Sequence, residues 1–170
     1  MTFIKISGAC YEFKGVNGKT YKLAPLGLKE LGEFVLWCKF YPMKEVFEEA
    51  KYIDNREKRE EFIDKKRQEI ANRKERINIK TGESISQDVD ITNNPDIVET
   101  DISLDSPSVM KLVSSPIGMA KLIYLSLRIN QPELDEGEIS KIVNINNIKE
   151  TKDAVDLISG LTLDTDSLGE

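Results

Sequence analysis

Histidine is absent from this 170-residue chain, and its absence removes several kinds of active site. Without an imidazole there is no Ser-His-Asp or Cys-His nucleophile, no histidine zinc site, and no side chain whose ordinary pKa lies near neutrality. Carboxylates, lysines and tyrosines can act as acids or bases only where burial or neighbouring groups shift their pKa values. The sequence shows no such arrangement, so we expect no enzymatic activity and no cofactor.

Cysteine is scarce, and long apolar runs and an excess of basic charge are missing. The two cysteines, Cys10 and Cys38, are too few for a disulfide framework and are predicted to be small buried hydrophobic residues. The chain has 24 basic and 30 acidic residues, a formal charge of −6, which argues against binding to nucleic acid or anionic membranes. No apolar run approaches the roughly 20 residues of a membrane span, and the first residues are too polar for a signal peptide. We therefore expect the protein to stay in the compartment where it is made.

A small antiparallel β-hairpin is the first element predicted, within residues 3–24. A two-residue turn would place Phe13 and Tyr21 on opposite faces of the sheet, whereas a three-residue turn over 16–18 pairs them on one apolar face. We predict the three-residue turn, with Gly18 in the left-handed conformation.

A helix is predicted to begin at Leu28, and Pro42 is predicted to end it or to bend it sharply. Apolar residues at positions 28, 31, 35 and 38 follow the spacing of a core-facing surface. Phe34, Trp37 and Tyr41 form a second line, here called the aromatic stripe. Two interpretations remain open: either both surfaces are core, or the aromatic stripe binds a partner helix.

Residues 43–77 predict one long charged helix, in which basic and acidic residues nearly balance and often stand four positions apart. Ile63, Ile70 and Ile77 recur every seven residues, but this seam is too thin for a self-sufficient coiled coil. A helix with so little burial gains little from its own packing. This predicted helix, here called the charged arm, is therefore either a solvated projection or a surface that a partner covers.

An acidic flexible linker is predicted over residues 78–107. Between Thr81 and Pro107 there are acidic residues and no basic one, with glycine, asparagine, serine and proline spread between them. This linker separates an N-terminal region, residues 1–77, from a C-terminal helical core, residues 108–161.

A partial calcium-loop pattern lies within the linker. Asp88, Asp90 and Glu99 occupy positions 1, 3 and 12 of such a loop. Position 6, which requires glycine, is Asn93, and no amphipathic helix flanks the loop closely on both sides. Acidic segments produce such spacings by chance, so we predict no metal site and keep these residues as a weak candidate.

The C-terminal region contains the most apolar helix of the chain. Between Met119 and Ile129 apolar residues occupy nearly every side, which predicts that this helix is buried. Asp135 is a predicted N-cap and Gly160 a predicted C-cap of later helices, and residues 162–170 form an acidic, frayed tail. The predicted fold is mainly α with a small N-terminal antiparallel β-hairpin, an α+β class, with a helical core and a projecting charged helix.

Two motifs carry a resemblance to a known family. Residues 21–34 begin Tyr-Lys-Leu-Ala-Pro-Leu, and residues 122–139 contain Leu-Ser-Leu-Arg followed by Pro-Glu-Leu. In this order, separated by a charged helix, they resemble the tail assembly chaperones of long-tailed bacteriophages. The chain departs from that pattern at Gly27, where a hydroxyl-bearing N-cap is expected, and in the length of its linker.

The resemblance implies a helper protein in the host cytoplasm. It would bind the helical tape-measure protein, prevent its aggregation, and assist tail-tube proteins in assembling around it. Helix docking is compatible with this role. The alternative is a structural component of the virion or of another assembly, in which the arm interlocks with neighbours. The sequence leaves self-association open. The residues predicted to contact the partner are Phe34, Trp37, Tyr41, Phe62, Ile63 and Ile70.

Overall fold

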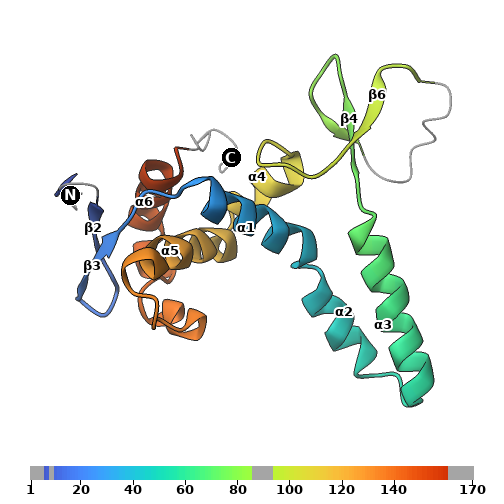
Figure 1. Cartoon of the computed structure of the whole chain (residues 1–170), viewed down its shortest axis with the longest axis horizontal. Helices are drawn as coiled ribbons and strands as arrows, with labels where there is room; N and C mark the ends of the chain where they lie inside the picture. Colours follow the sequence, from blue (N-terminus) through green and yellow to red (C-terminus); the bar gives the residue numbers. More distant parts are fainter. Residues whose placement is uncertain (1–5, 8–9, 86–93, 161–170) are drawn as a thin grey trace. The chain divides into compact units, whose positions relative to one another are not determined.

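The computed structural model describes residues 6–7, 10–85 and 94–160 and shows a mainly helical α+β fold, as predicted (Figure 1). The chain forms two compact units. The first unit contains residues 1–34 and 111–170, and the second contains residues 35–110. The second unit is therefore an insertion in the sequence of the first.

A three-stranded antiparallel sheet belongs to the first unit, with strand order β1-β2-β3. Phe13 pairs with Tyr21 across β2 and β3, and Gly18 has a φ of 77°. Both observations confirm the predicted three-residue turn, because only glycine adopts that φ at no steric cost. The strands are β1 (Ile6–Ser7), β2 (Cys10–Lys14) and β3 (Thr20–Leu23).

The helix α5 (Pro116–Asn130) is the centre of the first unit and packs on β3, α6 (Ile148–Ser159) and the 3-10 helix η1 (Glu136–Lys141). Its burial confirms the prediction from its apolar residues. The polar interruptions Lys121 and Ser126 are buried as well. Ser126 satisfies its hydroxyl by donating to the Ala24 carbonyl oxygen at 2.7 Å.

A tight corner precedes α5, after α4 (Pro107–Val113). The Ser115 hydroxyl donates to the Leu112 carbonyl oxygen at 2.6 Å and accepts from the Gly118 N–H at 3.1 Å. A Cβ on Gly118 would lie 1.9 Å from the Leu112 carbonyl oxygen, so only glycine fits. The sequence Ser-Pro-x-Gly thus caps α5 and lets the chain turn closely.

The predicted helix caps in the C-terminal region are present. Asp135 accepts from the Gly137 N–H at 2.6 Å and begins η1, which is a 3-10 helix and not a longer α-helix. A second 3-10 turn, η2 (Ile145–Asn147), leads into α6. Gly160 ends α6 with a φ of 66°, as predicted.

The helix α1 (Leu28–Phe40) begins in the first unit and continues into the second. The carboxylate of Glu30 accepts the N–H of Gly27 at 3.1 Å, which supplies the cap that a hydroxyl at position 27 would otherwise give. The helix ends before Pro42, as predicted.

The charged arm is two helices, so the prediction of one long helix over 43–77 is wrong. The chain forms α2 (Met43–Ala50) and α3 (Arg56–Ala71), which pack on each other. Asn55 caps α3 by accepting from the Lys58 N–H at 3.1 Å. The Arg59 guanidinium donates to the Ile53 carbonyl oxygen, with its two nitrogens at 3.0 and 2.7 Å. These side chains stabilise the turn between the helices, which helix propensity and charge pairing do not reveal.

The described part of residues 78–107 is not a loose linker, so that prediction is corrected. It contributes to a second antiparallel sheet with strand order β5-β4-β6. Glu99 pairs with Arg76, and Asp96 with Lys80 at 2.7 Å. Residues 81–107 contain no basic residue, but Arg76 and Lys80, which precede them, neutralise two of their acidic side chains. The strands are β4 (Glu75–Asn78), β5 (Ser84–Ile85) and β6 (Ile97–Thr100), and the predicted frayed tail 162–170 lies outside the described residues.

No single helix in the described residues is long and apolar enough to cross a membrane. The helices α4 and α5 reach that length and composition only when taken together, across a bend of 79°.

Candidate functional site

The predicted aromatic stripe is only partly accessible. Phe34 is fully buried, so its assignment to a docking surface is wrong. Trp37 and Tyr41 are half-buried, and their ring centroids lie 4.8 Å apart. The Lys44 ammonium lies 5.5 Å from the centroid of the Tyr41 ring. The core interpretation therefore holds for Phe34, and the two other rings pack on each other.

The predicted contact residues of the arm are mostly covered from within the chain. Ile70 is buried, and Phe62 and Ile63 are half-buried. The less exposed residues of α3 recur at the three- and four-residue spacing of one helix face, and α3 packs on α2. We therefore assign this face to the contact with α2, which reduces the area that a partner could cover. The residues of this face are Arg59, Phe62, Ile63, Lys66 and Ile70.

A different apolar surface is exposed on α1 and α2. Leu36, Phe40 and Phe47 are 59%, 42% and 46% exposed, and Met43 between them is half-buried. Their spacing of four, three and four residues keeps them on one side of a helical path. Pro42 interrupts the hydrogen bonding between the helices but has helical angles, φ −59° and ψ −17°. We call Leu36, Phe40, Met43 and Phe47 the Leu36–Phe47 stripe.

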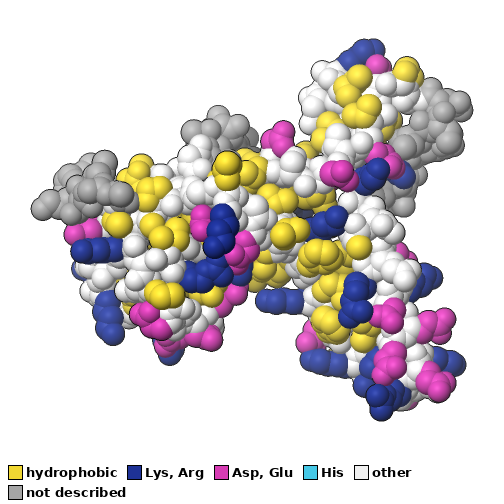
Figure 2. Space-filling model, viewed as in Figure 1, with side chains coloured by type: hydrophobic (Ala, Val, Ile, Leu, Met, Phe, Trp, Pro, Cys, Tyr) yellow, Lys and Arg dark blue, Asp and Glu magenta, His cyan; other side chains and the backbone are white. Residues whose placement is uncertain are grey.

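Hydrophobic side chains also gather over α2 and the neighbouring part of α3 on the face drawn in Figure 2, beside charged side chains. Large exposed hydrophobic residues that line up along a helix are typical of contact surfaces, whereas scattered single ones are ordinary. The Leu36–Phe47 stripe is therefore the candidate interaction surface of the second unit.

Helix periodicity read only as far as Pro42 does not reveal this stripe, because Met43 and Phe47 lie beyond the proline. The four-three-four spacing across Pro42 was the pattern that could have found the stripe.

Lysines border the stripe. Lys39 and Lys44 stand on either side of Phe40 in the sequence, and neither has a carboxylate within 4.0 Å among the described residues. By contrast, Lys51 at the end of α2 forms an ion pair with Glu48 at 2.5 Å. The borders of the stripe near Phe40 are thus positively charged.

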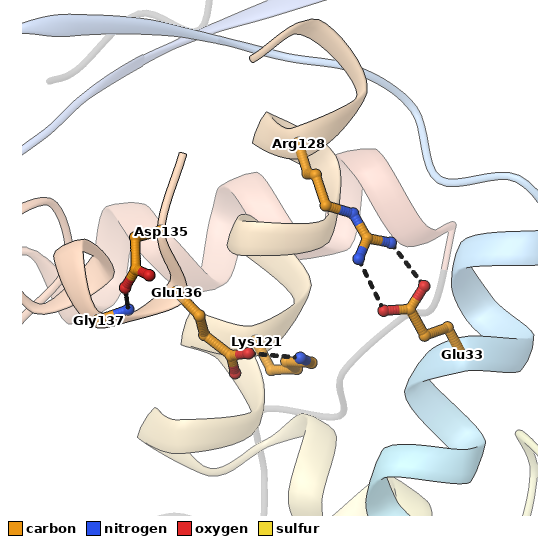
Figure 3. A network of polar contacts seen from close by, with 6 residues as sticks. All are labelled: Glu33, Lys121, Arg128, Asp135, Glu136 and Gly137. Carbon is orange, nitrogen blue, oxygen red and sulfur yellow. Dashed lines mark hydrogen bonds and ion pairs between the residues drawn. The ribbon is translucent and has the colours of Figure 1, made fainter. Parts of the chain in front are cut away.

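A separate polar network lies in the first unit (Figure 3). The Arg128 guanidinium donates to both carboxylate oxygens of Glu33, at 2.9 and 2.5 Å, and so joins α5 to α1. This pairing lowers the pKa of Glu33 and raises that of Arg128. Lys121, 8% exposed, donates to Glu136 at 2.9 Å. The ring of Tyr124 lies 4.9 Å from the Lys121 ammonium and 5.5 Å from the Arg128 guanidinium. These charges stabilise one another, and their contacts link helices.

The weak calcium candidate is not assembled in the described residues. Glu99 lies on β6 and accepts from the Arg76 guanidinium at 3.2 Å, while Asp88 and Asp90 lie outside the described residues. The described ranges contain no group of three or more potential metal ligands.

Cys38 is buried, and burial raises the pKa of its thiol to about 12.

No family model, no curated protein and no solved structure matches the chain. The function of the protein is therefore inferred from its surface. The Leu36–Phe47 stripe and its lysines are the residues that carry it.

Proposed function

We propose that this protein is a tail assembly chaperone that binds helical, apolar segments of a tape-measure-like protein in the host cytoplasm. In this role it keeps the bound segments from aggregating and assists tail-tube proteins in assembling around them. The observation that carries the proposal is the Leu36–Phe47 stripe, an exposed apolar line on two successive helices. Such a line fits another amphipathic helix, whose apolar residues it would cover.

The size of the stripe supports reversible binding. Full burial of a leucine or phenylalanine side chain contributes about 1.5–3 kcal/mol, and the three most exposed side chains are already about half-buried. The gross apolar gain is therefore about 2–5 kcal/mol, below the roughly 8 kcal/mol of a micromolar complex. Such weak binding by one copy suits a helper that must release its client during assembly. Several copies bound along one long client would together hold it more firmly.

The net charge supports the same role. A formal charge of −6 favours solubility and disfavours contact with nucleic acid. In this proposal the apolar stripe binds the client. We propose neither a nucleic acid nor a membrane as a partner.

The test is affinity capture of a tagged chain from infected cells, with mass spectrometry of the captured proteins and of the finished particles. We expect one long helical protein among the captured partners and no copy of this chain in the particles. The double variant Leu36→Glu/Phe40→Glu should lose that partner.

The matched control is Ile145→Glu/Leu157→Glu, which makes the same charge change at exposed apolar positions of the first unit and should retain the partner. Abundance of the chain in finished particles would overturn the proposal and identify a structural component instead. Equal loss of the partner in both variants would show that the stripe is not the binding surface.

A further inference from the structure

We propose that the Leu36–Phe47 stripe selects an amphipathic helix whose apolar face is bordered by carboxylates, and that Lys39 and Lys44 make this selection. The inference depends on the proposed function, because it names the chemistry of the segment bound at the same stripe. It adds a charge requirement that apolar contact alone does not impose.

The positions of the two lysines place them on opposite borders of the stripe. Successive residues of an α-helix are rotated by about 100°, so Lys39 lies about 100° from Phe40 on one side. Lys44 stands in the first turn of α2, and its ammonium lies against the ring of Tyr41, the residue that follows Phe40 on the side opposite Lys39. A helix docked on Phe40 would therefore have one ammonium group near each of its own borders.

Both ammonium groups are available for a partner. In the part of the chain that the structure describes, neither lysine has a carboxylate within 4.0 Å. Lys44 is exposed and its ammonium lies against the face of the Tyr41 ring, whereas Lys39 is half-buried. Elsewhere on the arm, Lys66 and Arg67 pair with carboxylates of their own helix. Two lysines without a carboxylate partner among the described residues thus stand beside Phe40, on a chain whose net charge is −6.

A second copy of the chain is a poor occupant of this surface. In an antiparallel arrangement that matches Phe40 with Met43 of the other copy, like borders face each other, so each lysine lies on the same side of the contact as its own equivalent. In a parallel arrangement opposite borders face each other, so Lys39 lies on the same side of the contact as Lys44 of the other copy. Both bring like charges together, which is unfavourable, whereas acidic borders on a different helix would be complementary.

The experiment uses the full chain and three synthetic helical peptides with the same apolar residues. The border positions of the peptides are all glutamate, all glutamine or all lysine, and binding is measured by fluorescence anisotropy at low salt. Two exposed ion pairs predict that the glutamate peptide binds roughly 3- to 10-fold more tightly than the glutamine peptide. The lysine peptide should bind most weakly, and about 0.5 M salt should bring the three affinities together.

The variant Lys39→Glu/Lys44→Glu should reverse the order of the peptides. Its control, Lys141→Glu/Lys149→Glu, makes the same charge change in the first unit and should keep the original order. This comparison separates a local effect of the stripe from the effect of net charge.

The failures are distinguishable. Equal binding of all three peptides, abolished by Leu36→Gln/Phe40→Gln, would overturn the charge selection and leave the proposed function standing. A preference for the glutamate peptide that survives Lys39→Glu/Lys44→Glu would overturn the role of these lysines. No binding of any peptide, with dimers of the chain detected by sedimentation, would overturn both the selection and the choice of occupant.

Discussion

Lys121 and Ser126 are polar residues inside the most apolar helix of the chain, and each satisfies its polar group differently. The Lys121 ammonium reaches Glu136 and the ring of Tyr124, while the Ser126 hydroxyl donates to the Ala24 carbonyl oxygen. A buried polar group without a partner is costly, so these contacts fix the rotation of α5 against its neighbours. Packing alone would specify that rotation less sharply.

The Glu33–Arg128 pair predicts a pH-dependent contribution to stability. Arg128 lowers the folded-state pKa of Glu33 below its ordinary value of 4.5. The stabilisation is therefore fully present above about pH 4.5 and is lost as pH falls through the folded pKa. Since both side chains are about one-third exposed, Glu33→Gln should cost only about 0.2–1 kcal/mol at pH 7.

Urea unfolding of the wild type and of Glu33→Gln between pH 3 and 7 measures this difference. The two curves should converge at the acid end. The exposed pair Glu138–Lys141 provides the control, since Glu138→Gln should change the unfolding free energy less. A Glu33→Gln deficit that stays constant down to pH 3 would contradict the pairing.

Cys38 should be inert while the protein is folded. Burial raises the pKa of its thiol to about 12, so almost none of it is thiolate at pH 8. In the variant Cys10→Ser, which leaves Cys38 as the remaining thiol of the two, a disulfide reagent should release no colour from the native protein. One equivalent should react in denaturant. Rapid native labelling at pH 8 would show that Cys38 is accessible.

At the scale of elements, the corner before α5 gives the sharpest mutational prediction. In Gly118→Ala the new methyl group would lie 1.9 Å from the Leu112 carbonyl oxygen, so the backbone must move. We expect a loss of at least about 2 kcal/mol in unfolding free energy, as is typical of strained core sites.

Gly32→Ala is the matched control on α1. A Cβ there meets nothing within 4 Å, so the substitution should stabilise the helix by about 0.5–1 kcal/mol. Circular dichroism during urea unfolding measures both changes. Equal effects of the two substitutions would contradict the steric interpretation.

Elements specified by local residues were predictable from the sequence. The Phe13–Tyr21 register follows from the turn length and Gly18, and the burial of α5 follows from its apolar residues. The second sheet was not predictable, because Glu99 is neutralised by Arg76, which lies outside the acidic segment. Charge counted along the chain does not show charge paired across strands.

The residues of the candidate surface were not predicted. The sequence left open whether the aromatic stripe on the helix before Pro42 is core or a docking surface, and Leu36 and Phe40 lie on that helix. Exposure is a tertiary property, however. Phe34 is buried, whereas Leu36 is exposed. Helix periodicity places each of them in a line of apolar residues and does not show which line is buried.

At the scale of the whole molecule, the division into two units predicts two unfolding transitions. Each unit has buried residues of its own, and α1 and α4 carry the chain from one unit to the other. Trp37, the single tryptophan, belongs to the second unit, so its fluorescence reports on that unit, whereas circular dichroism reports on helices in both.

A matched pair of core truncations separates the two transitions. Leu125→Ala in the first unit and Ile70→Ala in the second should each cost about 2–5 kcal/mol, with Ile70 at the lower end because it is slightly more exposed. We expect Ile70→Ala to lower the urea midpoint of Trp37 fluorescence, and Leu125→Ala to lower the midpoint by circular dichroism while leaving the fluorescence midpoint nearly unchanged. If both substitutions shift both probes equally, the chain unfolds as one cooperative body, and the Leu36–Phe47 stripe would then be held as rigidly as the core of the first unit.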